Sequence, residues 1–332
     1  MNTTAFIGCA HIHTPGFIKM LKERDDVMVK SVWDHDDARG QKRADEMNAR
    51  FFGDYRTILD DPEVKSVIIC AETNRHEELV LAAAGAKKHM FVEKPLGFAA
   101  DDARKMADAI EKAGVKFQIG YFMRGNPAYR FLKSEIDKGH FGRINRIRGS
   151  NCHAGALKGW FDQEWRWMAD PKLAGCGAFG DLGTHSLDIM LWLMGEVTRV
   201  SATIDPGNAR YGKDCDELGE ALMVFKNGAT GTLAASWNDI ANPVQLQLAG
   251  TEGHAVIVNG QLHYQSTQVN DSDIKQPWTQ LAPELPHAFN LFFDALAGKD
   301  VPLVPVREAA YRSAVMQAMY ESACQQKWVD VK

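Results

Sequence analysis

Apolar and polar residues alternate in two ways along the first third of the chain. Short apolar segments, such as "TAFIGCA", "KSVIICA" and "HMFVEKP", predict buried strands. The segments between them, such as "PGFIKMLKER" and "ADDARKMADAIEKAG", have apolar residues three or four positions apart, and this spacing predicts helices. Because strands that alternate with helices form βαβ units, we predict a parallel sheet with helices on its faces.

After about residue 121 the pattern becomes mainly strand-like. Helices are predicted over "PAYRFLKSEIDKG" and "GTHSLDIMLWLMG", but the later segments "TRVSATI", "VQLQLAGTEGHAVIV" and "QLHYQS" predict strands. We expect one domain over residues 1–121 and, over residues 122–332, an α+β domain with a mostly antiparallel sheet. Two closing helices are predicted near 287–297 and 307–325, and the last of them could pack across both domains.

The composition is that of an ordinary globular protein and excludes several classes of partner. The 332 residues include 38 lysines and arginines and 43 aspartates and glutamates, so the net charge is −5. No basic block indicates nucleic acid or a membrane surface, and no long apolar run predicts a membrane span. The six cysteines are scattered without a Cys-x-x-Cys motif. Together with the lack of a secretory signal pattern, this predicts reduced thiols in a cytoplasmic protein.

The residues "IGCAHIHTPGF" after the first strand allow two interpretations. A His-x-His pair, His11 and His13, is how a barrel hydrolase begins its metal site. The same residues could instead be a dinucleotide-binding turn of the G-x-G-x-x-G type. In that alignment Gly8 is kept, Ala10 replaces the second glycine, and His13 replaces the third.

The residues that follow favour the dinucleotide-binding turn. Thr14 is a good N-cap and Pro15 a good first helical residue, so we predict a helix that begins near Pro15 after a lengthened loop. Backbone N–H groups near His11, Ile12 and His13 could then hold phosphate. A barrel needs about twice the 120 residues over which the βα pattern lasts. We therefore keep the metal-dependent amidohydrolase only as a remote alternative and expect no metal.

Asp34 ends the second predicted strand, 26 residues after Gly8. A carboxylate at this place accepts hydrogen bonds from the ribose of NAD and repels the extra phosphate of NADP. Arg39, Lys42 and Arg43 follow on a predicted helix, where we expect them to form a solvated face. NADP is therefore not excluded as an alternative cofactor.

Two further motifs carry a family resemblance. "FVEKPLG" follows the fourth apolar strand, and "GCGAFGDLGTHSLDIMLWLMG" contains a glycine-rich turn before Asp181 and His185. Together with "DDPEVKSVIICAETNRH" and "FGRINRIRG", they resemble the Gfo/Idh/MocA oxidoreductases. The resemblance implies an NAD-binding Rossmann domain, a second domain that binds substrate, and a homo-oligomer, dimer or tetramer. It implies His185 as acid/base with Lys94 and Asp181 as partners, and a Lys94-Pro95 bond that could be cis.

The chemistry of these residues agrees with such a role. Asp181 and His185 are four positions apart, so on a helix both face one side. Histidine can take the hydroxyl proton of an alcohol, since it titrates near neutral pH. Lys94 can stabilise developing negative charge on the oxygen.

Other residues are weaker candidates that rest on the same resemblance or on their place in a loop. Those expected to contact cofactor are Thr73, His76, Glu93, Arg124 and Arg166. His153 and Trp165 are expected to contact substrate, and core packing is the alternative for Trp165.

We predict an NAD-dependent oxidoreductase that transfers hydride between nicotinamide and a secondary hydroxyl of a sugar, glycoside or cyclitol. The substrate class comes from the resemblance and from the polar and aromatic residues of 151–167. A keto-sugar reductase, or a redox-neutral enzyme with tightly bound NAD, is the alternative within the same family.

Overall fold

The computed structural model describes all 332 residues, and the chain divides into two units. The first unit holds Met1–Tyr121, Lys172–Gly175 and Pro286–Ser313. The second holds Phe122–Pro171, Cys176–Leu285 and Ala314–Lys332. The predicted boundary is a single one after Tyr121. In the structure, one short and one longer segment from the later part of the chain also belong to the first unit.

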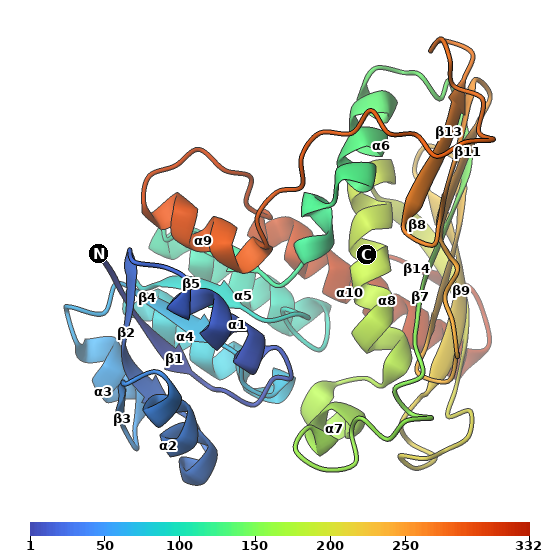
Figure 1. Cartoon of the computed structure of the whole chain (residues 1–332). Coiled ribbons are helices and arrows are strands. Elements are labelled where there is room, and N and C mark those ends of the chain that lie inside the picture. The colour runs from blue at the N-terminus through green and yellow to red at the C-terminus, as the bar shows by residue number, and fades with distance from the viewer. The chain divides into compact units, whose positions relative to one another are not determined.

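The first unit is built on a six-stranded parallel sheet with the order β3-β2-β1-β4-β5-β6 (Figure 1). Its strands are β1 (Asn2–Ile7), β2 (Val27–Trp33), β3 (Arg50–Phe51), β4 (Ser66–Ile69), β5 (His89–Val92) and β6 (Phe117–Ile119). Its main helices are α1 (Thr14–Lys22), α2 (Asp37–Glu46), α3 (Tyr55–Asp60), α4 (His76–Gly85), α5 (Ala100–Ala113) and α9 (Ala288–Leu296). The strand order reverses at β1 and β4, which is where an open parallel sheet binds ligands. The sheet is open, so the barrel hydrolase alternative is excluded.

Successive side chains of the central strands point to opposite faces of this sheet, which gives two cores. Ala5 and Ile7 of β1 pack with α3, α4 and α5, whereas Phe6 packs with α1 and α9. Helix α9 contributes Phe289, Phe292 and Phe293 to the second core. The apolar spacing predicts this late helix, and the sheet it covers is the one formed by the first third of the chain.

Helix ends in the first unit follow local capping rules, with one correction. The side chain of Asp36 accepts a hydrogen bond from Arg39 N–H and caps α2. Gly114 ends α5 with a φ of +65°, a left-handed conformation that glycine adopts easily. Thr14 is the first residue of α1 and His13 is its N-cap, so the prediction of Thr14 as N-cap is wrong by one residue.

The second unit is built on an eight-stranded sheet with the order β13-β12-β11-β7-β10-β9-β8-β14. All its neighbouring strands are antiparallel except β7 and β10. Its strands are β7 (Ile144–Cys152), β8 (Val197–Asp205), β9 (Leu218–Phe225), β10 (Thr230–Ser236), β11 (Val244–Gly250), β12 (Gly253–Val258), β13 (Gln261–Ser266) and β14 (Val329–Asp330).

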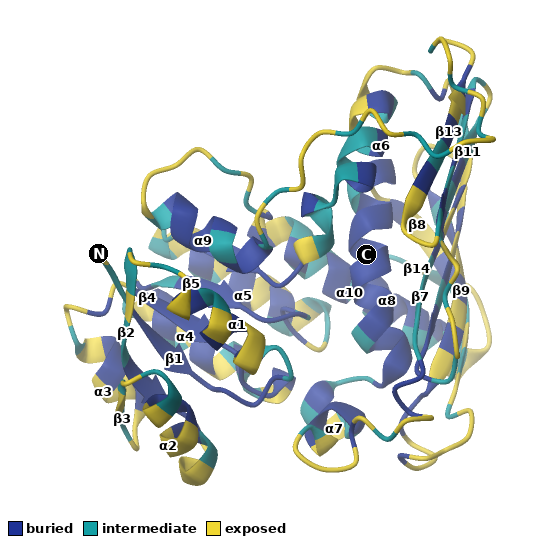
Figure 2. Ribbon diagram, viewed as in Figure 1, coloured by how far each residue is buried: buried dark blue, intermediate teal, exposed yellow.

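Helix α8 (Ala178–Met194) lies against β7, β9 and β10 and is buried almost throughout its length (Figure 2). The other helices that begin after Tyr121 are α6 (Pro127–Asp137), α7 (Pro171–Ala174) and α10 (Val306–Gln325). The two units share α10, since the first ends at Ser313 and the second resumes at Ala314. None of the helices combines the length and apolar content needed to cross a membrane.

Candidate functional site

Gly8 directly follows β1 and packs against Ala71, in the loop after β4, in a place that only glycine fits. Its φ is +100°, and a Cβ there would lie 2.4 Å from the Cβ of Ala71. Its N–H donates to the carbonyl of Trp33 at 2.8 Å, and its carbonyl accepts from Cys70 N–H at 3.3 Å. The retained first glycine of the motif therefore keeps the ends of three neighbouring strands close together.

The turn from His11 to Thr14 differs in detail from the predicted phosphate loop. The N–H of His11 donates to the carbonyl of Cys70 at 2.9 Å, and the N–H of His13 donates to Nδ1 of the His11 ring at 3.2 Å. Thr14 N–H donates to the carbonyl of His11. Two of the three N–H groups expected to face phosphate, those of His11 and His13, are thus already hydrogen-bonded within the protein, and Ile12 lies between them.

Asp34 is fully buried directly after β2 and accepts hydrogen bonds from several groups. Cys9 N–H lies 2.7 Å from Oδ2, and the guanidinium of Arg39 binds both carboxylate oxygens at 2.6 and 3.0 Å. Arg39 also donates to Glu72 at 3.0 Å. The expectation that Arg39 and Arg43 form a solvated face is wrong. The Arg39 side chain is 18% exposed and pairs with two acids, and Arg43 is buried beside Glu46.

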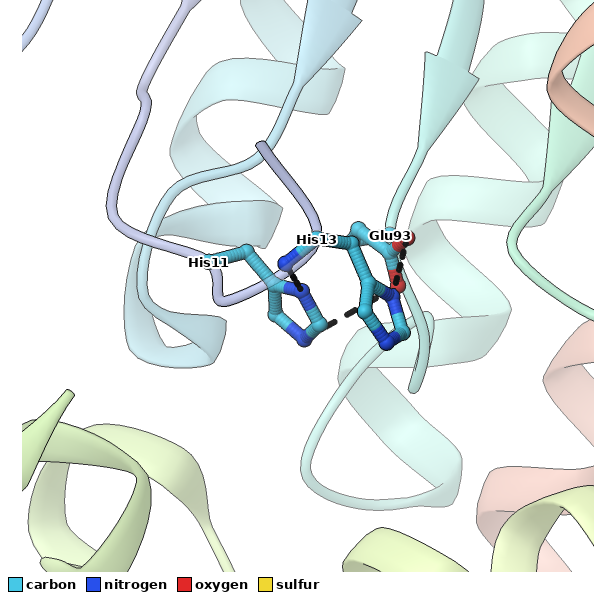
Figure 3. Close-up of side chains that lie close together, drawn as sticks. All are labelled: His11, His13 and Glu93. Carbon is cyan, nitrogen blue, oxygen red and sulfur yellow. Dashed lines mark hydrogen bonds and ion pairs between the residues drawn. The ribbon is translucent and has the colours of Figure 1, made fainter. Parts of the chain in front are cut away.

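Glu93 follows β5 and forms a cluster with both histidines of the turn (Figure 3). Its carboxylate lies 3.1 Å from His13 Nδ1 and 3.8 Å from His11 Nε2, and it accepts the N–H of Lys94 at 2.9 Å. Burial acts to raise the pKa of Glu93. The charges of His11, His13 and Lys94 and the hydrogen bond from His13 outweigh that effect and lower the pKa below its ordinary value. The group is therefore a buried carboxylate.

Lys94 and His76 are buried beside this cluster. The Lys94-Pro95 bond is cis, as the resemblance implied. The His76 ring lies at the start of α4 with Nδ1 3.0 Å from the carbonyl of Pro95 and Nε2 3.3 Å from that of Ala71. The ring thus links the loop after β4 to the loop after β5. Thr73, also buried, begins a short 3-10 turn in the loop after β4.

In the second unit Asp181 and His185 both lie on α8, one turn apart. Oδ2 of Asp181 accepts a hydrogen bond of 3.2 Å from the indole N–H of Trp237, a residue directly after β10. The Trp237 ring is fully buried against Phe161, with ring centroids 4.3 Å apart. The ring of Phe122 lies 5.2 Å from that of His185. The geometry holds the carboxylate of Asp181 in one direction.

The first turn of α8 is capped by a residue far away in the sequence. The buried carboxylate of Asp216 accepts N–H groups of Gly177 and Phe179 at 2.9 and 2.7 Å, and the hydroxyl of Tyr320 at 3.0 Å. A Cβ at Gly177 would lie 2.1 Å from the carbonyl oxygen of Asp216, so this position needs glycine. Asp216 therefore fixes the start of the helix that carries Asp181.

The remaining predicted contacts of the second unit have partners within that unit. Arg124 forms a bidentate pair with Asp188 of α8, at 2.8 and 2.6 Å, and that carboxylate is buried. Arg166 is exposed and donates to the carbonyls of Ala169 and Tyr211. His153 accepts the N–H of Gly155 and lies 4.6 Å from the exposed ring of Trp160. Trp165 is half-buried one residue before Arg166.

Three residues at these sites were not found from the sequence. Glu72 could have been, because it is a polar residue just after a strand of the parallel sheet, where ligands bind. Trp237 and Asp216 gave no signal, since they reach Asp181 and the start of α8 from 56 and 37 or more residues away.

Two family descriptions match the chain. "Oxidoreductase family, NAD-binding Rossmann fold" matches residues 3–121, and "GFO/IDH/MocA C-terminal domain" matches residues 129–256. The levoglucosan dehydrogenase of Pseudarthrobacter phenanthrenivorans is 28% identical over 342 residues, covering 85% of each chain. The scyllo-inositol 2-dehydrogenase (NAD(+)) of Bacillus subtilis is 30% identical, covering 64% of this chain and 60% of that one.

Solved structures share the fold over the whole chain. A levoglucosan dehydrogenase in complex with NADH and L-sorbose has a TM-score of 0.82 at 23% identity, covering 100% of this chain and 99% of that one. The WlbA dehydrogenase from Bordetella pertussis, in complex with NADH and UDP-GlcNAcA, has a TM-score of 0.81 at 20% identity, with 99% and 98% covered. The close approach at Gly8 and the buried acid after β2 both fit a bound dinucleotide. The chain belongs to the Gfo/Idh/MocA family of oxidoreductases and is an NAD-dependent dehydrogenase with a Rossmann fold in its first unit.

Proposed function

We propose that the protein oxidises a secondary hydroxyl of a sugar, glycoside or cyclitol. The observation that carries the proposal is the Asp181–His185 pair on buried α8, with Asp181 oriented by the Trp237 N–H. Bound NAD supplies the hydride acceptor, so the chain must supply a group that takes the hydroxyl proton. An imidazole one helical turn from a fixed carboxylate is suited to that task.

Each of the three proposed catalytic residues has a separate role. His185 takes the proton from the substrate hydroxyl, and Asp181 holds the imidazole in position and stabilises its charged form. Lys94 provides positive charge that stabilises the oxygen as its proton leaves. Glu93 accepts the Lys94 backbone N–H, and His76 contacts the carbonyl of the next residue, Pro95. The backbone on both sides of Lys94 is therefore held, which limits where its ammonium group can reach.

Asp34 is proposed to select NAD over NADP. Its carboxylate is buried where the ribose of a dinucleotide binds, at the end of the second strand. Arg39 neutralises part of that charge, but the guanidinium nitrogen that donates to Asp34 also donates to Glu72. Two acids therefore pair with one arginine, and the net negative charge disfavours the extra phosphate of NADP.

The substrate class is supported by the relatives' names and by the loop before α8. The relatives are named for levoglucosan and inositols, which are polyhydroxylated rings. In this chain Trp160 is 44% exposed and its ring lies 4.6 Å from His153, so an aromatic face and a polar ring are presented together. Such a pair can pack against the C–H face of a sugar while binding its hydroxyls.

A steady-state assay tests the proposal. NAD reduction is followed at neutral to alkaline pH with levoglucosan, myo-inositol, scyllo-inositol and simple aldoses, with NADP as the matched cofactor control. The expected result is turnover on at least one polyol, with a higher kcat/KM for NAD than for NADP. Absence of turnover on every substrate, with NAD retained through gel filtration, would instead favour a redox-neutral reaction.

A further inference from the structure

The cluster of His11, His13 and Glu93 has the composition of a metal site. The two imidazoles come from the loop after β1, and the carboxylate comes from the end of β5, so the three side chains converge from two elements (Figure 3). One potential ligand atom from each residue lies within 4.8 Å of the other two. His11 and Glu93 are buried, while the side chain of His13 is 37% exposed.

The separations are close to those of a bound transition metal. A tetrahedral ion with bonds of about 2.0–2.2 Å to nitrogen and oxygen keeps its ligand atoms about 3.3 Å apart. Oε1 of Glu93 lies 3.1 Å from His13 Nδ1, and its other oxygen, Oε2, lies 3.8 Å from His11 Nε2. His13 is the most exposed of the three ligands, so an ion can reach the cluster from its side. Two imidazoles and one carboxylate leave a fourth position for water.

The charge of the cluster also favours a cation. Glu93 is a carboxylate with 1% of its side chain exposed, and it follows two residues after Phe91 of the aromatic core. A buried negative charge is costly unless positive charge or hydrogen bonds compensate it. When both imidazoles are neutral, Lys94 still provides positive charge near the carboxylate, and a divalent ion between the three side chains would add to it.

Binding requires one rearrangement of protons. Nδ1 of His11 accepts the N–H of His13 at 3.2 Å, so in neutral His11 the ring proton is on Nε2, facing Glu93. To bind an ion through Nε2, this proton moves to Nδ1 and the 3.2 Å hydrogen bond is lost. The proton between His13 Nδ1 and Glu93 is likewise replaced by the ion and moves to Nε2 of His13. One long hydrogen bond and the contacts to the carboxylate are exchanged for three metal–ligand bonds.

We propose that His11, His13 and Glu93 form a binding site for one divalent transition-metal ion of the class that prefers imidazole with carboxylate, such as Zn²⁺, Co²⁺ or Ni²⁺. The site differs from the barrel hydrolase alternative, because its third ligand follows a strand of an open Rossmann sheet. None of its three ligands is one of the proposed catalytic residues Lys94, Asp181 and His185, although Glu93 also accepts the backbone N–H of Lys94.

Direct titration of the full-length chain, prepared without a histidine tag, tests the proposal. Zn²⁺ binding is measured by calorimetry, and Co²⁺ binding by the visible absorption of the ion, which reports nitrogen and oxygen ligands in a low-symmetry site. We expect one ion per chain. His13→Ala and His13→Gln should each weaken binding at least about tenfold, and Glu93→Gln should do the same.

His89→Gln is the matched control, because His89 lies at the opposite end of β5 and outside the cluster. It should keep the affinity of the unaltered chain. Equal affinity in His13→Ala, His13→Gln and the unaltered chain would overturn the proposal, as would the absence of any one-to-one binding. These readouts do not depend on turnover, so a failed dehydrogenase assay leaves them interpretable.

Discussion

The two units position their candidate residues by different means. In the first unit Gly8, Asp34 and Glu93 each follow the end of a parallel strand, so the topology of the sheet alone brings them to one edge. In the second unit Asp181 and His185 share a single helix, and residues far along the chain orient that helix. A site at strand ends is therefore visible in a sequence, whereas the supports of a helical site are not.

His185→Ala should have the largest effect of the four substitutions, and this effect should be on turnover. An effect on NAD binding would contradict the division of roles between the two units. Loss of a general base lowers turnover by about 10²–10⁴-fold. The dissociation constant of NAD, measured by fluorescence quenching, should stay unchanged because His185 belongs to the second unit. His254→Ala, on the sheet of the same unit, is the control and should keep full activity. Unchanged turnover in His185→Ala would remove it from the mechanism.

Asp34→Ala tests the strand-end site of the first unit. Loss of the hydrogen bonds that the ribose donates to a charged acceptor, at about 1.5–3 kcal/mol, should raise the KM for NAD by roughly ten- to a hundredfold. The kcat at saturating NAD should change much less, and the ratio of NADP to NAD activity should increase. Asp37→Ala, at an exposed acid on the first turn of α2, is the control. If both mutants have the same cofactor preference as the unaltered chain, Asp34 does not select the cofactor.

Trp237→Phe tests the long-range support of Asp181 in the second unit. The substitution keeps an aromatic ring in the core but removes the N–H that Asp181 accepts. A net hydrogen bond of about 0.5–1.5 kcal/mol predicts a two- to tenfold loss of kcat, with little change in KM, and a shifted pH profile. Trp278→Phe, on a different aromatic cluster of the same unit, controls for loss of an indole. An equal loss in both variants would point to packing instead of orientation.

Substitution of His76 should have the smallest effect, and the quantity that it changes is the free energy of unfolding. Burial lowers the pKa of His76 from 6.5, more than the contacts to the carbonyls of Leu96, Ala71 and Pro95 raise it. The unfolded chain therefore binds more protons than the folded chain below about pH 6.5, so the stabilising contribution of neutral His76 is lost as the pH falls. Urea unfolding at about pH 7 and about pH 5 measures this loss, which is at most about 1.4 kcal/mol per pH unit.

His76→Gln should be less stable than the unaltered chain at neutral pH but should lose less of its stability on acidification. His140→Gln, at a partly exposed histidine of the second unit, is the control. A slope with pH that is the same in both variants would mean that other groups account for the acid sensitivity.

Much of the fold follows from local patterns, and the failures have particular physical causes. The predicted strands of the parallel sheet and the long helices are confirmed, because apolar periodicity decides them. The solvated face predicted for Arg39 and Arg43 from their sequence neighbours is wrong, because their partners are the acid after β2 and Glu46. The short β3, α3, α7 and β14 were missed, since two to six residues show no periodicity. Trp237 acts across 56 positions, a distance that no local pattern records.

The late position of α9 in the chain limits when the first unit can fold during synthesis. One face of the parallel sheet needs Phe289 and its neighbours, which are made 168 residues after Tyr121. At about 5–20 residues per second, this leaves that face uncovered for roughly ten to thirty seconds after its last strand has emerged. The first unit therefore cannot complete its fold during synthesis before the second unit has been made. Its first unit waits for nearly the whole polypeptide, and its apolar surface is meanwhile a target for chaperones.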